Sequence, residues 1–431
     1  MLPRIPIKYL YHIILASMAK TNQKQFLVFA LAVILIGGFS LPLGVYELGT
    51  AVNTHSGIGF FAFPLKGSSG SSSLTPTTYP AYIPIQIWKA YEYTSNGNYN
   101  SSYGKGEVIA IIDAYGSPTI VNDVNYFDNY FGLPKINLTV VQPFGKVSKN
   151  GGWALETSLD VEWAHAMAPG ASIVLIETPS ASNTYLINDA VNYAINVTHA
   201  NVISMSWGEA ESYLTSTQLA QYDSVFHYAA SHGVILVAAS GDNGANDSTS
   251  SPTVDYPSAD PNVVGAGGTT LILKDLSSTT ASYSNEYAWN SSGGGISSYF
   301  PEPSYQANAG ISLSGRGVPD VSYDANPNTG VWVYDTTPYQ GIDGWGEVGG
   351  TSAAAPQWAA IFADAQSIHG SANINGQNVH NLLYSIYSSS SYSSAFHDIT
   401  VGYNGWYYAG PGYDEVTGIG SPIVYELINL L

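Results

Sequence analysis

The sequence predicts an α/β fold in which layers of helices flank a mostly parallel sheet. From residue 107 onward, apolar strand-like runs alternate with helical runs, which is the pattern of βαβ units. The strand-like runs cover 108–113, 173–177, 202–206 and 234–239, and the helical runs cover 120–130, 186–196 and 218–231. Ligands bind beyond the carboxyl ends of parallel strands. We therefore expect Asp113, Ser206 and Asp242, which end or follow three of these strands, to meet in one crevice.

The composition excludes several classes of function. Among 431 residues there are 12 Lys and Arg against 31 Asp and Glu, a net charge of -19, so we expect no nucleic-acid partner. Charged residues make up only 10%, so uncharged polar side chains cover the surface, which suits an acidic medium. Cysteine is absent, which excludes disulfides, thiol nucleophiles and Cys-based zinc sites.

The N-terminal region predicts export. Residues 1–25 form a basic flank, and residues 26–45 carry no charge and are long enough to cross a bilayer as a hydrophobic helix. This stretch is either a retained membrane anchor or a cleaved signal, and with a start at Met18 it resembles an ordinary signal; a buried core helix is the alternative. Residues 46–81 read as a Gly/Ser/Pro-rich tether, and the folded body is expected at 82–431, secreted or anchored to the membrane.

A Gly-framed serine is the first candidate for chemistry. Ser352 lies in the motif Gly-Gly-Thr-Ser-Ala-Ala-Ala-Pro, just before the Ala-rich helical run 357–365. Exposed amides and the helix dipole at such an N-terminus favour a developing oxyanion. The alternative is a serine that only caps the helix.

A pair of carboxyls is the candidate base. Glu156 and Asp160 are four residues apart, on one face of the helix predicted around 153–165. When buried, two such carboxyls raise each other's pKa and share a proton, which yields a base that works in acid. The alternative is a solvated acidic face. The nine histidines offer no helix-start motif typical of a catalytic base.

Asp242 follows an apolar strand in a Gly-flanked turn. Asp242 is either an ordinary turn residue or, if its carboxyl group is protonated, a hydrogen-bond donor to an oxyanion. Together with Glu156-x-x-x-Asp160 and Gly-Thr-Ser352, the Ser-Gly-Asp242 motif resembles the sedolisin family of serine-carboxyl peptidases. The resemblance runs from about Tyr82 to the C-terminus. It includes Ser-Met-Ser-Trp-Gly at 204–208, Tyr-Pro-Ser-Ala-Asp-Pro at 256–261 and Val-Pro-Asp-Val at 318–321.

The resemblance implies a subtilisin-like three-layer fold, with about seven strands in a mostly parallel sheet, that hydrolyses peptide bonds at low pH. Each implied role falls on a matching residue: Ser352 as nucleophile, Glu156 as general base and acid, Asp160 as its orienting partner and Asp242 as the oxyanion-hole acid. Ser206 and Gly208 would hold an extended substrate through main-chain groups. Asp113 and Trp207 would surround the carboxyl pair.

The resemblance also implies one structural calcium ion. Asp398 and Asp414 would supply side-chain oxygens, and Ile399, Gly410 and Gly412 would supply backbone carbonyls, because Ca²⁺ takes about 6–8 oxygen ligands. The alternative is a Gly-rich loop with two surface acids. One departure concerns the large N-terminal pro-domain of this family, for which the interval between Val45 and Tyr82 is too short.

Three functions follow as hypotheses. The leading one is an acid-active endopeptidase that acts on proteins or peptides, with a monomeric catalytic domain. The second is a neutral subtilisin-like peptidase that uses Asp113, a histidine and Ser352. The third is a non-catalytic cell-surface binding protein on the same scaffold. A glycosidase with Glu156 and Asp160 as its carboxyl pair would leave the Ser352 motif unexplained.

Overall fold

The computed structural model describes residues 58–67, 75–76, 81–95, 99–277 and 280–431. The basic flank 1–25 and the hydrophobic helix expected within 26–45 lie outside these residues. Within the part of the chain that is described, no helix combines the length and the apolar character needed to cross a membrane.

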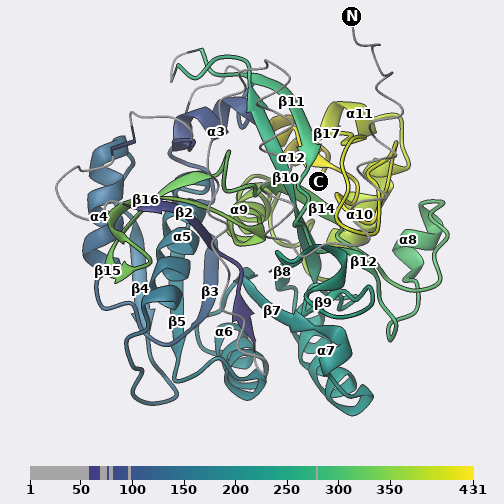
Figure 1. Cartoon of the computed structure of the whole chain (residues 1–431), viewed down its shortest axis with the longest axis horizontal. Coiled ribbons are helices and arrows are strands. Elements are labelled where there is room, and N and C mark those ends of the chain that lie inside the picture. The colour runs from purple at the N-terminus through teal and green to yellow at the C-terminus, as the bar shows by residue number, and fades with distance from the viewer. Residues whose placement is uncertain (1–57, 68–74, 77–80, 96–98, 278–279) are drawn as a thin grey trace, which may run out of the picture. The chain divides into compact units, whose positions relative to one another are not determined.

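An eight-stranded sheet forms the centre of the fold (Figure 1). All its strands are parallel except β11, which runs antiparallel to β10, so the prediction of a mostly parallel sheet is confirmed. The strands follow the order β11-β10-β8-β6-β3-β5-β4, and β14 also pairs with β10. Their bounds are β3 Val108–Ala114, β4 Asn137–Val141, β5 Ser172–Thr178, β6 Val202–Met205, β8 Ile235–Ala239, β10 Val264–Leu273, β11 Tyr283–Ala288 and β14 Val321–Asp324.

Helices cover both faces of this sheet. Alternate residues of a strand face opposite sides. In β3, Ile109 and Ile111 therefore pack into the core that contains α5 (Gly151–Met167) and α9 (Thr351–His369). Ala110 and Ile112 pack into the second core, with η1 (Thr184–Val191) and α7 (Ser216–Ser231), and α6 (Asn192–Asn196) continues η1.

Helix α5 is buried along nearly its whole length. The side chain of Asn150 caps its N-terminus by accepting a 3.2 Å hydrogen bond from the Trp153 N–H. Since α5 lies between α9, β3 and β15 (Val331–Tyr339), its polar side chains are enclosed by protein. The alternative of a solvated acidic face on this helix is therefore wrong.

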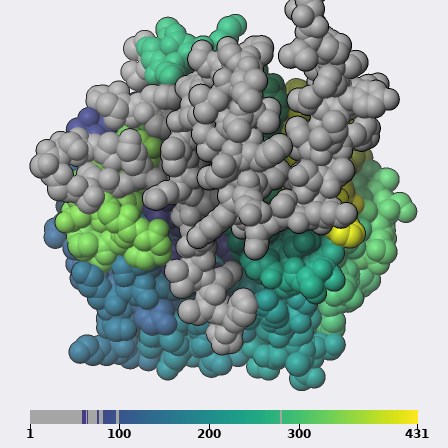
Figure 2. Space-filling view, viewed as in Figure 1, coloured from purple at the N-terminus to yellow at the C-terminus, as the bar shows by residue number. Residues whose placement is uncertain are grey.

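Smaller elements surround the sheet. In the space-filling view, the blue and teal segments from α4 to α7 form the lower half of the face shown, and the light-green hairpin of β15 and β16 reaches the surface at the left (Figure 2). The remaining bounds are α3 Pro84–Ala90, α4 Ile120–Phe131, β7 Trp207–Ala210, η2 Glu211–Tyr213, η3 Gly244–Asn246, β9 Asp255–Tyr256, β12 Gly295–Ile296, α8 Ser304–Asn308, β13 Gly317–Val318, β16 Ile342–Gly349, α10 Val379–Tyr387, α11 Tyr392–Ala395, β17 Phe396–His397, β18 Ser421–Pro422 and α12 Val424–Leu430.

Part of the predicted tether is regular structure. Within 46–81, the structure has two strands, β1 (Gly59–Phe60) and β2 (Phe63–Gly67). β1 pairs antiparallel with β7, and β2 pairs antiparallel with β16. The physical reason is composition, because the stretch from 58 to 65 is apolar and the Gly/Ser tract begins only at Gly67.

Candidate active site

Three elements bring the predicted catalytic side chains to the carboxyl-end edge of the sheet. Helix α5 carries Glu156 and Asp160 one turn apart, and both side chains are fully buried. Ser352 is the second residue of α9, and Asp242 follows the end of β8. Ser206, directly after β6, lies between the two helices.

Ser206 connects the carboxyl pair to the candidate nucleophile. Its hydroxyl donates a 2.8 Å hydrogen bond to Oδ1 of Asp160, and its carbonyl accepts one of 3.3 Å from Oγ of Ser352. Its hydroxyl also lies 3.5 Å from the Ser352 carbonyl. That carbonyl is free of the usual helical bond because Pro356, four residues later, has no N–H to donate.

The pKa of Glu156 is raised well above its ordinary value. Burial is the main cause, and the nearby Asp113 and Asp242 raise the pKa further. The Ser352 hydroxyl and the Ala62 N–H are close enough to lower it in part, although neither forms a well-aligned hydrogen bond with the carboxylate. Glu156 therefore has unfilled acceptor capacity next to the serine.

The pKa values of Asp160 and Asp113, which also lie near Glu156, are raised as well. Burial raises the pKa of Asp160, Asp113 and Glu156 raise it further, and the Ser206 hydroxyl opposes this by favouring the charged form. Burial raises the pKa of Asp113 to about 7, and neither of its carboxylate oxygens has a well-aligned hydrogen-bond partner among the described residues. The group therefore holds protons in acid that isolated carboxyls would lose.

Asp242 faces the start of α9. Its Oδ1 accepts hydrogen bonds from the Thr351 N–H at 2.7 Å and the Thr351 hydroxyl at 2.8 Å, and burial raises its pKa to about 8. Its Oδ2 has no hydrogen-bond partner among the described residues and points to Gly350, where a Cβ would lie only 2.5 Å away. Gly350 also has φ +112°, so glycine is required on both grounds. The sequence analysis assigned no role to Thr351, the residue directly before Ser352, which binds Asp242 through its N–H and its hydroxyl.

The remaining predicted residues of the crevice lie on or beside β7. The indole N–H of Trp207 donates a 2.7 Å hydrogen bond to the Ile112 carbonyl, which fixes this strand to β3. Gly208 packs tightly, since a Cβ there would lie 2.8 Å from the Tyr256 carbonyl oxygen. Their roles toward a substrate stay predictions.

No histidine in the described part of the chain hydrogen-bonds to Ser352. His165, on α5, lies within 2.8 Å of the Pro134 carbonyl, and burial lowers its pKa to about 4. The contacts of His232, His369 and His380 are with Tyr228, Ile428 and Asp320. The structure thus offers no support for the neutral, histidine-based hypothesis.

The predicted calcium ligands meet at one loop. The Gly412 N–H donates to both oxygens of Asp398 at 3.0 and 3.2 Å, and the Gly410 N–H donates to Oδ2 of Asp414 at 3.1 Å. Ile399 is buried beside them. This all-oxygen donor set fits a hard cation. Within the described residues no three Asp, Glu or His side chains form a metal cluster, so such a cation would take most ligands from carbonyls and water.

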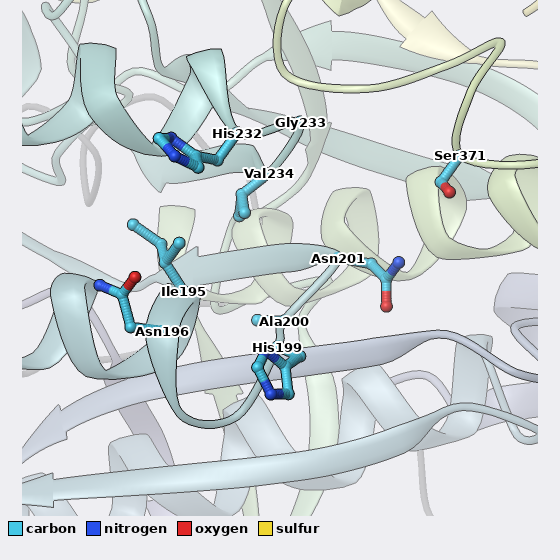
Figure 3. Close-up of a pocket in the computed structure, with 9 residues that line it drawn as sticks. All are labelled: Ile195, Asn196, His199, Ala200, Asn201, His232, Gly233, Val234 and Ser371. Carbon is cyan, nitrogen blue, oxygen red and sulfur yellow. The ribbon is translucent and has the colours of Figure 1, made fainter.

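One pocket of about 460 Å³ lies elsewhere (Figure 3). Asn201 and Val234, which line it, directly precede β6 and β8, so the pocket is at the amino ends of these strands. The close-up shows His199 and His232 on different segments of its wall. It is therefore at the opposite edge of the sheet from Ser352 and Glu156.

Comparison with known proteins agrees with this geometry. The model of the Subtilase family matches residues 148–394, which is more than half of the chain. The chain belongs to the subtilase family. This subtilase is also similar to a solved structure of Pseudomonas sedolisin, described as a serine-carboxyl proteinase complexed with two molecules of pseudo-iodotyrostatin. The TM-score is 0.71 at 30% identity, over 82% of this chain and 98% of that one. The predicted sedolisin resemblance and subtilisin-like fold are thereby confirmed.

Two curated relatives extend the comparison. Kumamolisin from Bacillus sp. (strain MN-32) is 34% identical over 394 residues, which cover 84% of this subtilase and 65% of the relative. Sedolisin from Pseudomonas sp. (strain 101) is 29% identical over 390 residues, which cover 83% and 62%. The chain thus spans a little under two thirds of the length of these relatives.

Proposed function

We propose that the chain is an acid-active serine endopeptidase that hydrolyses proteins or peptides. Ser352 is the nucleophile, Glu156 the general base and acid, Asp160 its orienting partner, and Asp242 the oxyanion-hole acid. The observation that carries the proposal is the continuous contact from Asp160 through Ser206 to Ser352, beside a Glu156 carboxylate with free acceptor capacity. Ser352 would not need these contacts if it only capped helix α9, and neither would Glu156 and Asp160 if they formed a solvated acidic face.

In the proposed reaction, the Ser352 hydroxyl gives its proton to Glu156 as its oxygen attacks the peptide carbonyl carbon. Asp242, neutral below about pH 8, donates its O–H to the developing oxyanion. Glu156 then protonates the leaving amine, and it next takes a proton from the water that hydrolyses the acyl-enzyme. Asp160 shares the proton of Glu156, since two buried carboxyls cannot easily both ionise.

The calcium site and export belong to the same proposal. Asp398 and Asp414, with the carbonyls of Ile399, Gly410 and Gly412, would hold one Ca²⁺, which cross-links the loop when bound. Equilibrium dialysis with Ca²⁺ tests this: Asp414→Asn should lose one bound ion, and the exposed Asp275→Asn should not.

Export of the protein is proposed from the sequence of residues 26–45 alone. A monomeric catalytic domain remains the expectation.

Digestion of a peptide library across a range of pH tests the activity. The full chain should cut peptides best at about pH 4, where a carboxyl pair can share a proton, and Ser352→Ala should cut none. Cleavage that peaks near neutrality would favour a histidine base instead. Inertness at every pH, together with tight peptide binding, would favour a non-catalytic binding protein.

A further inference from the structure

The hairpin formed by residues 401–409 carries the most exposed large apolar side chains in the described part of the chain. Tyr408 is 72% exposed, Trp406 59% and Val401 57%, whereas every other such side chain that the structure describes is at most 56% exposed. Tyr403 pairs with Tyr408 across the hairpin in an antiparallel bridge, with ring centroids 4.4 Å apart. No residue of 401–409 is charged. Apolar surface gathered in one place marks an interaction site, and we call this segment the aromatic hairpin.

Hydrogen bonds and packing fix the frame of the aromatic hairpin. The Asn404 side chain is buried in its turn and accepts a 3.0 Å hydrogen bond from the Tyr407 N–H. The Asn404 N–H donates back to the Tyr407 carbonyl at 3.1 Å. Tyr407 and Ala409 pack against the small core that contains Ala288 and Val416. The backbone that carries the exposed rings is therefore ordered before a partner binds, which lowers the entropic cost of binding.

The aromatic hairpin is bonded to the turn that carries Asp242. The Asn404 carbonyl accepts a 2.9 Å hydrogen bond from the Ala245 N–H, and the Asn404 side-chain amide donates one of 3.2 Å to the Ser292 carbonyl. Ala245 follows Asp242 by three residues, so the Cα atoms of these two residues are at most about 11 Å apart. The hairpin therefore belongs to the surroundings of the candidate oxyanion hole.

A peptide bound in the candidate active site is long enough to reach the aromatic hairpin. An extended chain advances about 3.3 Å per residue, so six residues cover about 20 Å. This length exceeds the separation of at most about 11 Å between Asp242 and Ala245, and the remainder passes the contact at Asn404. A substrate chain that leaves the crevice on this side therefore meets Trp406 or Tyr408 within about six residues of its scissile bond.

The chemistry of the exposed rings selects the kind of side chain that binds. Trp406 and Tyr408 offer broad apolar faces, and the N–H and O–H at their edges can form hydrogen bonds to peptide groups. Since the hairpin carries no charge, it favours neither acidic nor basic side chains. An aromatic or aliphatic side chain that packs on the rings removes apolar area of both partners from water. Unfolded polypeptides expose such side chains, because folding buries most of them.

We propose that the aromatic hairpin is a docking site for an extended, unfolded polypeptide substrate. In this complex, an aromatic or aliphatic side chain about four to six residues from the scissile bond packs on Trp406 and Tyr408. The inference rests on the proposed function and names the substrate class of that same site. Contacts this far from the reacting bond are equally strong before and during the reaction, so they lower KM and leave kcat unchanged.

Steady-state kinetics of the full chain at about pH 4 test the docking site with three peptides that share one cleaved sequence. One peptide has about six residues, and the others carry about eight more, phenylalanines included, on the N-terminal or the C-terminal side. Trp406→Ala should raise KM about tenfold for one extended peptide at unchanged kcat, and should leave the short peptide unaffected. Trp406→Phe keeps an aromatic ring and should hold KM within about twofold of wild type. Tyr130→Ala, at an exposed tyrosine on α4, is the control and should change no KM.

A binding measurement separates the docking site from the proposed chemistry. Ser352→Ala should cut no peptide, so titration calorimetry at about pH 4 can measure its affinity for the same extended peptides. Adding Trp406→Ala to this variant should weaken the binding of one of them about tenfold. Equal KM and equal affinity with and without the Trp406 ring would overturn the inference and leave the proposed function intact. A chain that binds extended peptides through Trp406 but cuts none of them would support the docking site and overturn the proposed function.

Discussion

The hydroxyl of Ser206 donates a 2.8 Å hydrogen bond to Oδ1 of Asp160. This bond favours the charged form of Asp160 and opposes the effect of burial on its pKa. The same residue presents its carbonyl to Ser352. Ser206 thus acts on the carboxyl pair through its side chain and on the nucleophile through its backbone.

Ser206→Ala separates these two roles. The carbonyl remains, but the pKa of Asp160 should rise further because the hydrogen bond to its charged form is lost. We expect the acidic limb of the kcat profile to move to higher pH, with a lower kcat at about pH 4. Ser204→Ala is the matched control, since Ser204 lies on the same β6 strand and its buried hydroxyl has no hydrogen-bond partner in the part of the chain that the structure describes. An unchanged profile in Ser206→Ala would show that this bond does not tune the pair.

Substitutions of Asp242 test the oxyanion role. Asp242→Ala should lower kcat by about 10²–10³-fold, the usual cost of a lost oxyanion donor. Asp242→Asn keeps an N–H donor and should retain most of the rate at about pH 4. Steady-state kinetics of the two variants measure this difference. Equal losses in both would contradict the donor role of Asp242, since Asn keeps a donor for the oxyanion and also keeps the acceptor for the Thr351 N–H and hydroxyl.

The fold should lose stability as pH rises. Burial raises the pKa values of Asp113 and Asp260 to about 7, and that of Asp242 to about 8, whereas an unfolded Asp has a pKa near 3.9. The unfolded chain therefore releases these protons first, so stability is complete below about pH 4 and falls as pH rises to about 8. The urea midpoint of Ser352→Ala, which avoids self-digestion, should decrease from pH 4 through 6 to 8.

Asp260→Asn in the same background is the control for this pH dependence. Asp260 lies outside the site and accepts a 3.0 Å hydrogen bond from the Tyr256 hydroxyl. Its neutral replacement should make the decrease in the urea midpoint less steep. A midpoint that rises between pH 4 and 8 would contradict the protonation states assigned to these buried carboxyls.

Arg316 and Asp320 form a fully buried ion pair. The guanidinium also donates to the Gly317 carbonyl, and the Tyr384 hydroxyl donates a 2.7 Å bond to Asp320. Arg316→Met leaves the Asp320 carboxylate without its cation and should cost about 3–5 kcal/mol of unfolding free energy. Lys274→Met, at an exposed site, should cost under about 0.5 kcal/mol. Urea unfolding at pH 7 measures both, and equal small costs would show that the pair contributes little.

The sequence predicts the central sheet well because the relevant signal is local. The apolar runs at 108–113, 173–177 and 234–239 become β3, β5 and β8 with bounds shifted by only one residue. The run at 186–196 becomes a helix whose first part is a π-helix, a hydrogen-bond pattern that periodicity does not reveal. The strand ends predicted only that Asp113, Ser206 and Asp242 would meet. The closeness of Glu156, Asp160 and Ser352 was expected from the sedolisin resemblance, because the two acids lie within a helix and not at a strand end.

Non-local contacts were not predictable. The pairing of β1 with β7 joins residues about 150 positions apart, and nothing local in 58–60 indicates its partner. The linking role of Ser206 depends on its hydroxyl reaching Asp160 and its carbonyl reaching the Ser352 hydroxyl, and these contacts become visible only when α9 lies against β6. The burial of α5 was also hidden, because its polar and apolar residues do not separate onto two faces.

The most direct test of the account is kcat/KM of Glu156→Gln at about pH 4, measured beside wild type and Glu162→Gln. Glu162 is a buried acid on the same helix, bonded to the Tyr334 N–H at 3.0 Å and away from Ser352. If Glu156 takes the proton of Ser352, its replacement should lower kcat/KM by about 10²–10⁴-fold while Glu162→Gln stays near wild type. Wild-type kcat/KM in a folded Glu156→Gln would contradict the serine-carboxyl mechanism.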